Sequence, residues 1–184
     1  GTIVDKNGNV LAKTDTAADG SETREYPYGN AFAHVVGYNV QGKSGIESLE
    51  NYDLLTSDEN FLIKLKNEFQ DKKNMGNTVV TTLDADLQEA AYQALGDKKG
   101  AVVAMEPKTG KILAMVSKPD FDPNTVEENW NSLSSDTNSV LLNRATQGQY
   151  APGSTFKVVT LLEFMRENPD YSSYSYNCTG SIEN

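Results

Sequence analysis

The chain has 184 residues, of which 38% are hydrophobic and 23% charged, and its 16 basic and 26 acidic residues give a formal net charge of −10. This length holds one ordinary domain or two small ones, and the apolar content excludes wholesale disorder. Because no stretch concentrates Lys and Arg, nucleic-acid binding is not expected. The single cysteine, Cys178, excludes an intramolecular disulfide and a cysteine-based zinc site.

The apolar runs and the first residues of the chain show neither a predicted membrane-spanning helix nor a start methionine. The longest apolar runs, such as Ile112 to Val116, are far shorter than the ~18 residues of a membrane-spanning helix, and no signal peptide is visible. The chain starts at Gly1, without a Met and inside a strand-like pattern. We therefore expect it to be a piece of a longer protein.

Short elements are predicted in the first part of the chain. In order they are a strand, a turn at Asn7-Gly8 and a second strand over 1–14, a polar loop over Asp15 to Gly29, a strand over Phe32 to Val36, and helices over Ile46 to Leu55 and Asn60 to Phe69. The charged, Gly-containing stretch Asp71 to Asn77 follows and is the best candidate boundary. We therefore predict two regions, 1–74 and 75–184.

The second region begins with a predicted strand over Thr78 to Leu83. Asp84 can then cap a helix over Ala85 to Leu95. An apolar stripe is predicted on this helix at Leu87, Ala90, Ala91, Ala94 and Leu95.

A hairpin and an apolar helix are predicted after it. Two nearly continuously apolar strands, Ala101 to Met105 and Ile112 to Val116, flank the turn Pro107 to Gly110, as expected for a sheet with both faces covered. The segment Phe156 to Met165 predicts a helix that is apolar almost all round and therefore buried, and Pro169 ends it.

Two motifs resemble binding sites, one for a nucleotide and one for a calcium ion. Residues Gly37 to Ser44 satisfy the phosphate-loop pattern G-x-x-x-x-G-K-[ST], with a predicted strand before and a helix after, so a nucleotide-binding protein is an alternative interpretation. Gly45 and the short following helix speak against it. Residues Asp120 to Asn124 imitate the start of a calcium loop, but Thr125 and Asn131 occupy its glycine and glutamate positions, so a capped turn is favoured. No metal or cofactor is predicted.

The third motif lies in Tyr150 to Lys157 and points to nucleophilic catalysis. Ser154 and Lys157 are one helical turn apart, and Pro152-Gly153 places Ser154 at a helix N-terminus, where backbone N–H groups favour developing negative charge. A serine nucleophile needs a base, and His34 is interpreted as a packed strand residue, which leaves Lys157 if burial keeps some of its amine neutral. A capping serine with a solvated lysine is the bland alternative.

Several segments, in order, resemble the class B penicillin-binding proteins. They are GTIVDKNGNVLA from Gly1, AHVVGYN with SGIESLENYDLL, VVTTLDADLQEAAYQAL, GAVVAMEPKTGKILAMVSKPDFDPN, and LLNRATQGQYAPGSTFK. The departures are the absence of an arginine before Gly1, and Ala151 where a second Pro is common. This resemblance also accounts for Gly37 to Ser44 without a nucleotide. The triplets Lys108 to Gly110 and Ser175 to Asn177 spell K-T-G and S-x-N, but their positions differ from the family's second and third motifs, which we expect beyond Asn184.

The resemblance implies an α+β fold. Residues 1–74 would be a small mixed, non-catalytic pedestal or dimerisation-type region, and residues 75–184 the incomplete first part of a β-lactamase-like transpeptidase domain with an antiparallel sheet and covering helices. Ser154 would be acylated by D-Ala-D-Ala stem peptides of peptidoglycan and by β-lactams, with Lys157 as base and the Ser154 N–H in the oxyanion hole. The piece alone is expected to be inactive.

The resemblance also implies a place and a partner. The protein would act on the extracytoplasmic face of the bacterial cell membrane, with an anchor upstream of Gly1. Residues 1–74 would bind a membrane-embedded cell-wall polymerase, and a non-enzymatic interaction role for the piece is the second interpretation.

Overall fold

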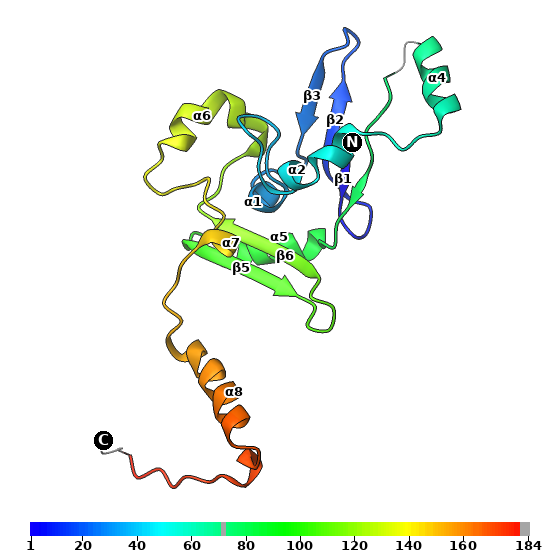
Figure 1. Ribbon diagram of the computed structural model, residues 1–184. Coiled ribbons are helices and arrows are strands. Elements are labelled where there is room, and N and C mark those ends of the chain that lie inside the picture. The colour runs from blue at the N-terminus through cyan, green and yellow to red at the C-terminus, as the bar shows by residue number, and fades with distance from the viewer. Residues whose placement is uncertain (71–72, 181–184) are drawn as a thin grey trace. The chain divides into compact units, whose positions relative to one another are not determined.

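The computed structural model describes residues 1–70 and 73–180. The chain forms two compact units, Gly1–Gly148 and Gln149–Asn184, and each is described here by itself (Figure 1). Helices and strands are mixed in the first unit, and its hairpin is antiparallel, which confirms the predicted α+β class.

A four-stranded sheet is formed by described residues of the first unit. Its strands are ordered β3 (Glu22–Glu25), β2 (Val10–Thr16), β1 (Ile3–Val4) and β4 (Val79–Val80). β1 is antiparallel to β2 and parallel to β4. The predicted strand–turn–strand unit is therefore confirmed, whereas the strand predicted over Thr78 to Leu83 is only two residues long.

The strand β3 corrects the loop predicted over Asp15 to Gly29. β3 pairs with β2 in the register Lys13↔Glu25, and Lys13 Nζ lies 2.9 Å from a carboxylate oxygen of Glu25. Such a polar edge strand has no apolar alternation, so its sequence pattern resembled a loop.

The segment Phe32 to Val36, predicted as a strand, is helical. A 3₁₀ turn, Gly29–Phe32, leads directly into α1 (Ala33–Val36). Phe32, Ala33, His34 and Val36 are all buried, and short apolar runs that are buried on every side cannot be distinguished as strand or helix from their pattern. His34 is therefore a packed residue of a helix rather than of a strand.

Three further helices follow in this part of the chain. They are α2 (Gly45–Leu49), α3 (Asn51–Leu55) and α4 (Phe61–Phe69). The helix predicted over Ile46 to Leu55 is thus two short helices interrupted at Glu50, and the helix predicted over Asn60 to Phe69 is confirmed. Residues 71–72 of the predicted boundary stretch lie outside the described residues, and the division into 1–74 and 75–184 stays a prediction.

The helix α5 (Ala85–Leu95) begins as predicted, since the Leu87 N–H donates to Asp84 Oδ1 at 3.1 Å. Its buried face was not predicted. Ala85 and Gln88 are buried while Leu87 is 38% exposed. The Gln88 amide bonds the backbone of Ala31 and of Met115 at 2.7 to 2.8 Å, so this polar side chain connects α5 to its neighbours.

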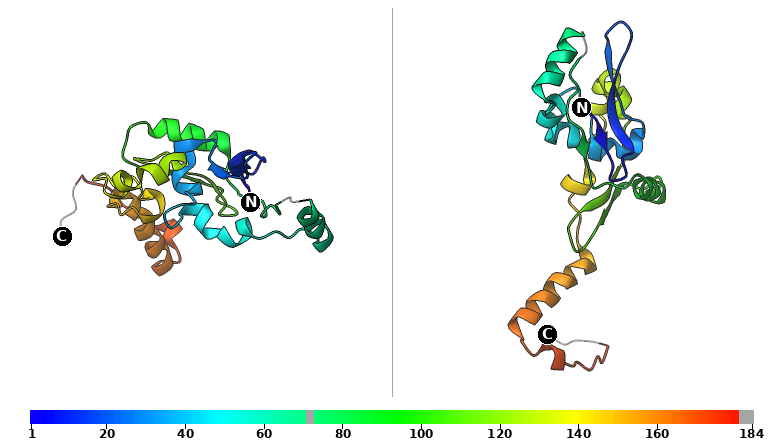
Figure 2. Two further views of the ribbon diagram at one scale, coloured as in Figure 1. Left: turned by 90° about the horizontal axis from the view of Figure 1, so that it is seen from above. Right: turned by 90° about the vertical axis from the view of Figure 1, so that its right-hand side faces the viewer.

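The helix α5 packs against the predicted hairpin, which is confirmed as β5 (Gly100–Met105) and β6 (Ile112–Lys118) (Figure 2). On β5, Val103 and Met105 are about half exposed, so the expectation that both faces of this hairpin are covered is not met within these residues.

The rest of the first unit consists of a 3₁₀ turn, Pro123–Thr125, and the helices α6 (Val126–Ser134) and α7 (Arg144–Gln147). One apolar core lies among the first strands and helices and α5, and includes Ile3, Leu11, Phe32 and Leu83. Ala33, Tyr38, Phe121 and Val126 form a second core. Residues on both sides of position 74 thus share the same interior.

The second unit contains a 3₁₀ turn, Gly153–Phe156, the helix α8 (Lys157–Glu167), and another 3₁₀ turn, Tyr171–Ser173. The helix predicted over Phe156 to Met165 is confirmed. Among the residues that the structure describes, no helix is both long and apolar enough to cross a bilayer.

Candidate active site

Ser154 lies at the point where the chain turns into the helix of the second unit. Gly153 has φ +52°, a left-handed conformation that favours glycine, and it opens the 3₁₀ turn that contains Ser154. The turn continues directly into α8, whose first residue is Lys157. Pro152 and Gly153 therefore set the start of the helix, as the sequence predicts.

The backbone brings Ser154 and Lys157 onto one turn. The Lys157 N–H donates to the Ser154 carbonyl, and residues three apart eclipse each other in 3₁₀ geometry. Both side chains are exposed, and they form no hydrogen bond with each other. Their assignment as nucleophile and base stays a prediction.

The backbone N–H of Ser154 lies in the first turn of the helical segment. Amides at this position precede the first intrahelical hydrogen bond, so they are free to bind an anion or a developing oxyanion. The local geometry is thus suited to one oxyanion-hole donor.

The burial predicted for the apolar helix is wrong for this chain. On α8, Val158, Leu161 and Leu162 are 55 to 62% exposed, and Phe156 just before it is 56% exposed. A side-chain contact on the helix is the edge-to-face pair of Phe164 with Tyr174, whose ring centres are 5.0 Å apart. The described residues of the second unit are too few to surround an 11-residue helix.

The structure around Gly37 to Ser44 does not match that of a phosphate loop. The segment follows the helix α1 and not a strand, and the Lys43 ammonium donates to Asn51 Oδ1. Its Gly37 and Gly42 have positive φ, as in a tight turn. The sequence match therefore reflects a glycine-rich connection between α1 and α2.

The calcium-like segment and His34 have structural roles as well. Asp122 Oδ1 accepts from the Asn124 N–H at 2.9 Å, so the calcium-like segment is a capped turn, as the sequence predicts. His34 is buried against Phe121 with ring centres 5.1 Å apart. Within residues 1–70 and 73–180, no group of three or more His, Cys, Asp or Glu is arranged to hold a metal ion.

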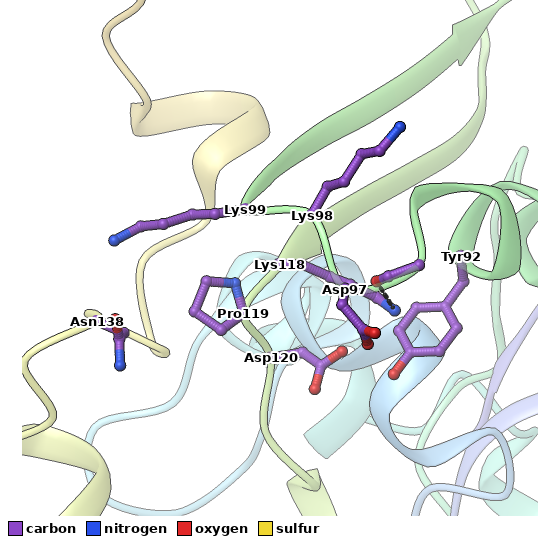
Figure 3. Close-up of a pocket in the computed structure, with 9 residues that line it drawn as sticks. Tyr92, Asp97, Lys98, Lys99, Lys118, Pro119, Asp120 and Asn138 are labelled. Atoms are coloured by element: carbon purple, nitrogen blue, oxygen red, sulfur yellow. Dashed lines mark hydrogen bonds between the residues drawn. The ribbon is translucent and has the colours of Figure 1, made fainter.

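A separate polar pocket of about 400 Å³ lies in the first unit (Figure 3). Lys118 Nζ lies 3.6 Å from the centre of the Tyr92 ring and donates to the Gly96 carbonyl at 2.8 Å. Burial, and then a hydrogen bond with Asp120, raises the pKa of Tyr92 to about 12. The Lys118 ammonium and the Tyr92 phenol are thus satisfied by protein groups, and the pocket contains neither Ser154 nor Lys157.

Sequence reasoning gave no role to Asn143 and Arg144, although both lie in the quoted segment that ends at Lys157. Asn143 caps α7 by accepting from the Ala145 N–H at 3.0 Å, and the Arg144 side chain is buried. An Asn before a short helix is a recognisable capping signal, but burial of an arginine has no signature in one sequence.

Comparisons with known proteins agree on both halves of the chain. Residues 100–179 match the family model of the penicillin binding protein transpeptidase domain, and residues 1–79 match that of the penicillin binding protein A dimerisation domain. Ser154 and Lys157 both lie inside the first of these matches.

Among curated relatives, the peptidoglycan D,D-transpeptidase PbpA of Mycolicibacterium smegmatis is 42% identical over 171 residues, which cover 83% of this chain and 35% of that protein. The peptidoglycan D,D-transpeptidase MrdA of Acinetobacter baumannii is 36% identical, over 73% of this chain and 25% of that protein. The chain thus spans about a third or less of the length of these relatives.

A solved structure of penicillin-binding protein A from M. tuberculosis, an imipenem acyl-enzyme complex, matches with a TM-score of 0.81 at 33% identity, over 91% of this chain and 42% of that one. The D,D-transpeptidase domain of a peptidoglycan glycosyltransferase from Eggerthella lenta matches with a TM-score of 0.73 at 40% identity, over 91% and 37% of the two chains.

Proposed function

Because this chain belongs to the class B penicillin-binding proteins, we propose that it is part of a peptidoglycan D,D-transpeptidase with Ser154 as nucleophile and Lys157 as general base. The observation that carries the proposal is the position of this pair, one turn apart at the start of a helix that follows a left-handed glycine. The acyl-enzyme complexes of the M. tuberculosis relative support it, since they require a nucleophile.

The proposed reaction transfers an acyl group in two steps. Ser154 Oγ attacks the carbonyl of the D-Ala-D-Ala peptide bond while the neutral amine of Lys157 takes the hydroxyl proton. The tetrahedral intermediate collapses, and the terminal D-Ala leaves with a proton on its amine. An amine of a neighbouring stem peptide then attacks the ester, which forms the cross-link and returns the proton to Ser154. A β-lactam would acylate the same oxygen, with opening of its ring.

The oxyanion of each intermediate needs two donors for full stabilisation. The Ser154 N–H is one of them in this proposal, and a strand outside these 184 residues supplies the other. Loss of one oxyanion-hole donor typically lowers the rate by ~10²–10³. The exposed apolar face of α8 supports the same conclusion, because we infer that the remainder of the transpeptidase domain covers it. The 184-residue chain alone should therefore acylate very slowly.

The test is a mass shift with penicillin on the longer protein that carries this chain. We expect stoichiometric addition for the unaltered protein and none for Ser154→Ala. Lys157→Ala should slow acylation by about 10²–10⁴-fold, the range of general-base catalysis. Matched controls are Ser135→Ala and Lys108→Ala, both at exposed positions of the first unit, which should acylate normally. Persistent labelling of Ser154→Ala would exclude Ser154 as the nucleophile.

We further propose that residues 1–74 bind a membrane-embedded cell-wall polymerase on the extracytoplasmic face of the membrane, with the anchor upstream of Gly1. The supporting observation is the apolar surface of α2, α3 and α4. Its large side chains are 69 to 84% exposed at Leu49, Tyr52, Leu55, Leu62 and Phe69. Exposed apolar side chains of this size are candidates for an interaction surface, and a protein partner would cover these.

This second role is compatible with the first and is tested separately. The longer protein is co-purified with the polymerase from the same cells, with and without the paired substitution Leu49→Glu and Tyr52→Glu. We expect the substitution to lower the captured polymerase at least tenfold while penicillin labelling is unchanged. Unchanged capture would exclude this surface as the polymerase-binding site.

A further inference from the structure

The loop between α6 and α7 is closed by one buried guanidinium. Arg144 is 5% exposed, and its side chain donates to the carbonyl oxygens of Asn138, of Ser139 at 3.1 Å and of Leu142 at 3.4 Å. The planar fork of an arginine is suited to several carbonyl acceptors at once. Ser139 has φ +54°, which is uncommon outside glycine, so the loop holds a conformation that these contacts stabilise.

The same loop is attached to the strand β6. The Arg144 N–H donates to Ser117 Oγ at 2.9 Å, and Ser117 Oγ donates to the Leu142 carbonyl at 3.2 Å. Ser117 is 3% exposed, so both bonds lie in the interior. The start of α7 is thereby fixed to the central hairpin.

The loop is also attached to α1, in the region matched by the dimerisation domain. His34 Nε2 lies 2.8 Å from the Val140 carbonyl oxygen, and because that oxygen only accepts, Nε2 carries the proton and donates. In the other direction, Asn143 Nδ2 donates to the His34 carbonyl at 3.2 Å. The loop between α6 and α7 is therefore joined by hydrogen bonds both to β6 and to α1.

These contacts lie just upstream of the proposed nucleophile. The helix α7 ends at Gln147, and Ser154 follows Arg144 by ten residues. The chain leaves the first unit next to Gly148. Whatever fixes α7 therefore also fixes the point from which the short connection to Ser154 departs.

We propose that Asn143 and Arg144 are positioning residues for the acyl transfer, which anchor to β6 and to α1 the end of the first unit, from which the chain continues to Ser154. The proposal rests on the proposed function. Neither side chain touches the reacting atoms in this mechanism. Their loss should therefore lower the rate of bond formation more than the affinity for the antibiotic, since small misplacements of a nucleophile can cost ~10²-fold.

The experiment measures acylation of the longer protein by a fluorescent penicillin in rapid-mixing experiments, which separate the first-order acylation constant from the apparent dissociation constant. Melting temperature and final labelling stoichiometry are measured on the same samples. The variants are Arg144→Ala, Arg144→Lys and Asn143→Ala. The matched control is Arg24→Ala, because the side chain of this first-unit arginine is only 8% exposed and is paired with Glu47 at 2.7 Å, away from this loop.

We expect Arg144→Ala to lower the acylation constant at least tenfold, with one label still bound at the end point and the dissociation constant within threefold. Arg144→Lys should show an intermediate loss, since a lysine can satisfy only part of the carbonyl set. Arg24→Ala should lower the melting temperature by at least as much and leave the acylation constant within twofold. Asn143→Ala is the milder change and should lower the acylation constant several-fold. It tests the proposal if Arg144→Ala does not fold.

Wild-type acylation constants in the Arg144 and Asn143 variants would overturn the proposal. So would an equal loss in Arg24→Ala, because the effect would then follow stability alone. If the unaltered protein is not acylated, or if Ser154→Ala still is, the proposed function itself fails and this inference fails with it. The two failures are thus distinguished within the same set of measurements.

Discussion

The two units of the chain differ in how they are stabilised. The first, Gly1–Gly148, has two buried apolar clusters, whereas no described residue of Gln149–Asn184 is buried. Yet the second unit carries both proposed catalytic residues. The unit that carries the proposed nucleophile therefore has no core of its own among its described residues, and the unit that folds around its own core carries neither of the two proposed residues.

Buried polar groups sharpen this contrast. In the first unit, Asp5 and Gln88 are completely buried, and their side chains make hydrogen bonds to several backbone groups. Such networks specify one arrangement of the elements that they join. In the second unit, the ion pair of Arg166 with Glu163 is exposed, and exposed pairs contribute little.

The largest expected effect comes from dividing the chain at the boundary between the units. Residues 1–148 should unfold in one cooperative transition, with a melting temperature close to that of the 184-residue chain. A peptide of residues 149–184 should show no cooperative transition, because isolated helices shorter than about 12–15 residues are marginal in water. Circular dichroism melts of the three samples check this. A cooperative melt of the peptide would contradict the comparison.

A matched pair of leucines tests the same difference within one chain. Leu11 is 1% exposed and Leu161 is 55% exposed. In the 184-residue chain, Leu11→Ala should lower the free energy of unfolding by about 2–5 kcal/mol, while Leu161→Ala should change it by less than about 0.5 kcal/mol. Urea denaturation gives both values. In the longer protein, Leu161→Ala should lower the free energy of unfolding markedly. An equally small effect in the 184-residue chain and in the longer protein would contradict burial of α8.

The Asp5 carboxylate should give a smaller effect that depends on pH. Burial alone would raise the pKa of Asp5, but hydrogen bonds from Asn9, Ala85 and Asn7 outweigh it and hold this pKa below 3.8. The unfolded chain therefore takes up the proton first, so the stabilisation is present above pH 3.8 and is lost as pH falls through the lower folded pKa.

Asp5→Asn should accordingly lower the free energy of unfolding by about 1–3 kcal/mol at neutral pH. The difference between the two proteins should shrink as the pH falls below 3.8, which denaturant titrations at several pH values can measure. A constant difference across this range would contradict the assignment.

The smallest expected effect belongs to His34. Burial lowers the pKa of His34 below its usual 6.5. As pH falls below 6.5, the unfolded chain takes up a proton that the folded chain resists, so stability decreases, by at most about 1.4 kcal/mol for each pH unit. His34→Gln should remove this slope just below pH 6.5 in denaturant titrations. An unchanged slope would assign it to other groups.

Sequence patterns predicted the elements that carry strong local signals. The Asp84 cap with its helix, the hairpin around Pro107 to Gly110, and the helix that starts after Pro152-Gly153 all depend on neighbouring residues alone. The candidate pair Ser154 and Lys157 also follows from local spacing. These features need no knowledge of distant contacts.

The features that sequence reasoning missed are decided by distant contacts. The run Phe32 to Val36 is helical because it is buried among α2, β6 and the core, and Gln88 is buried because backbone groups 27 and 57 residues away accept or donate to it. The sequence did not predict the exposure of α8, because an apolar pattern indicates that a helix face needs to be buried but does not identify the residues that bury it.

The most direct test of the account compares acylation of the 184-residue chain with acylation of the longer protein, each with and without Ser154→Ala. Both are mixed with the same penicillin and followed by intact-mass spectrometry. We predict a stoichiometric shift of the longer protein that requires Ser154, and acylation at least about 100-fold slower for the 184-residue chain. A rapid stoichiometric shift of the 184-residue chain would contradict the conclusion that Ser154 depends on contacts from outside these residues.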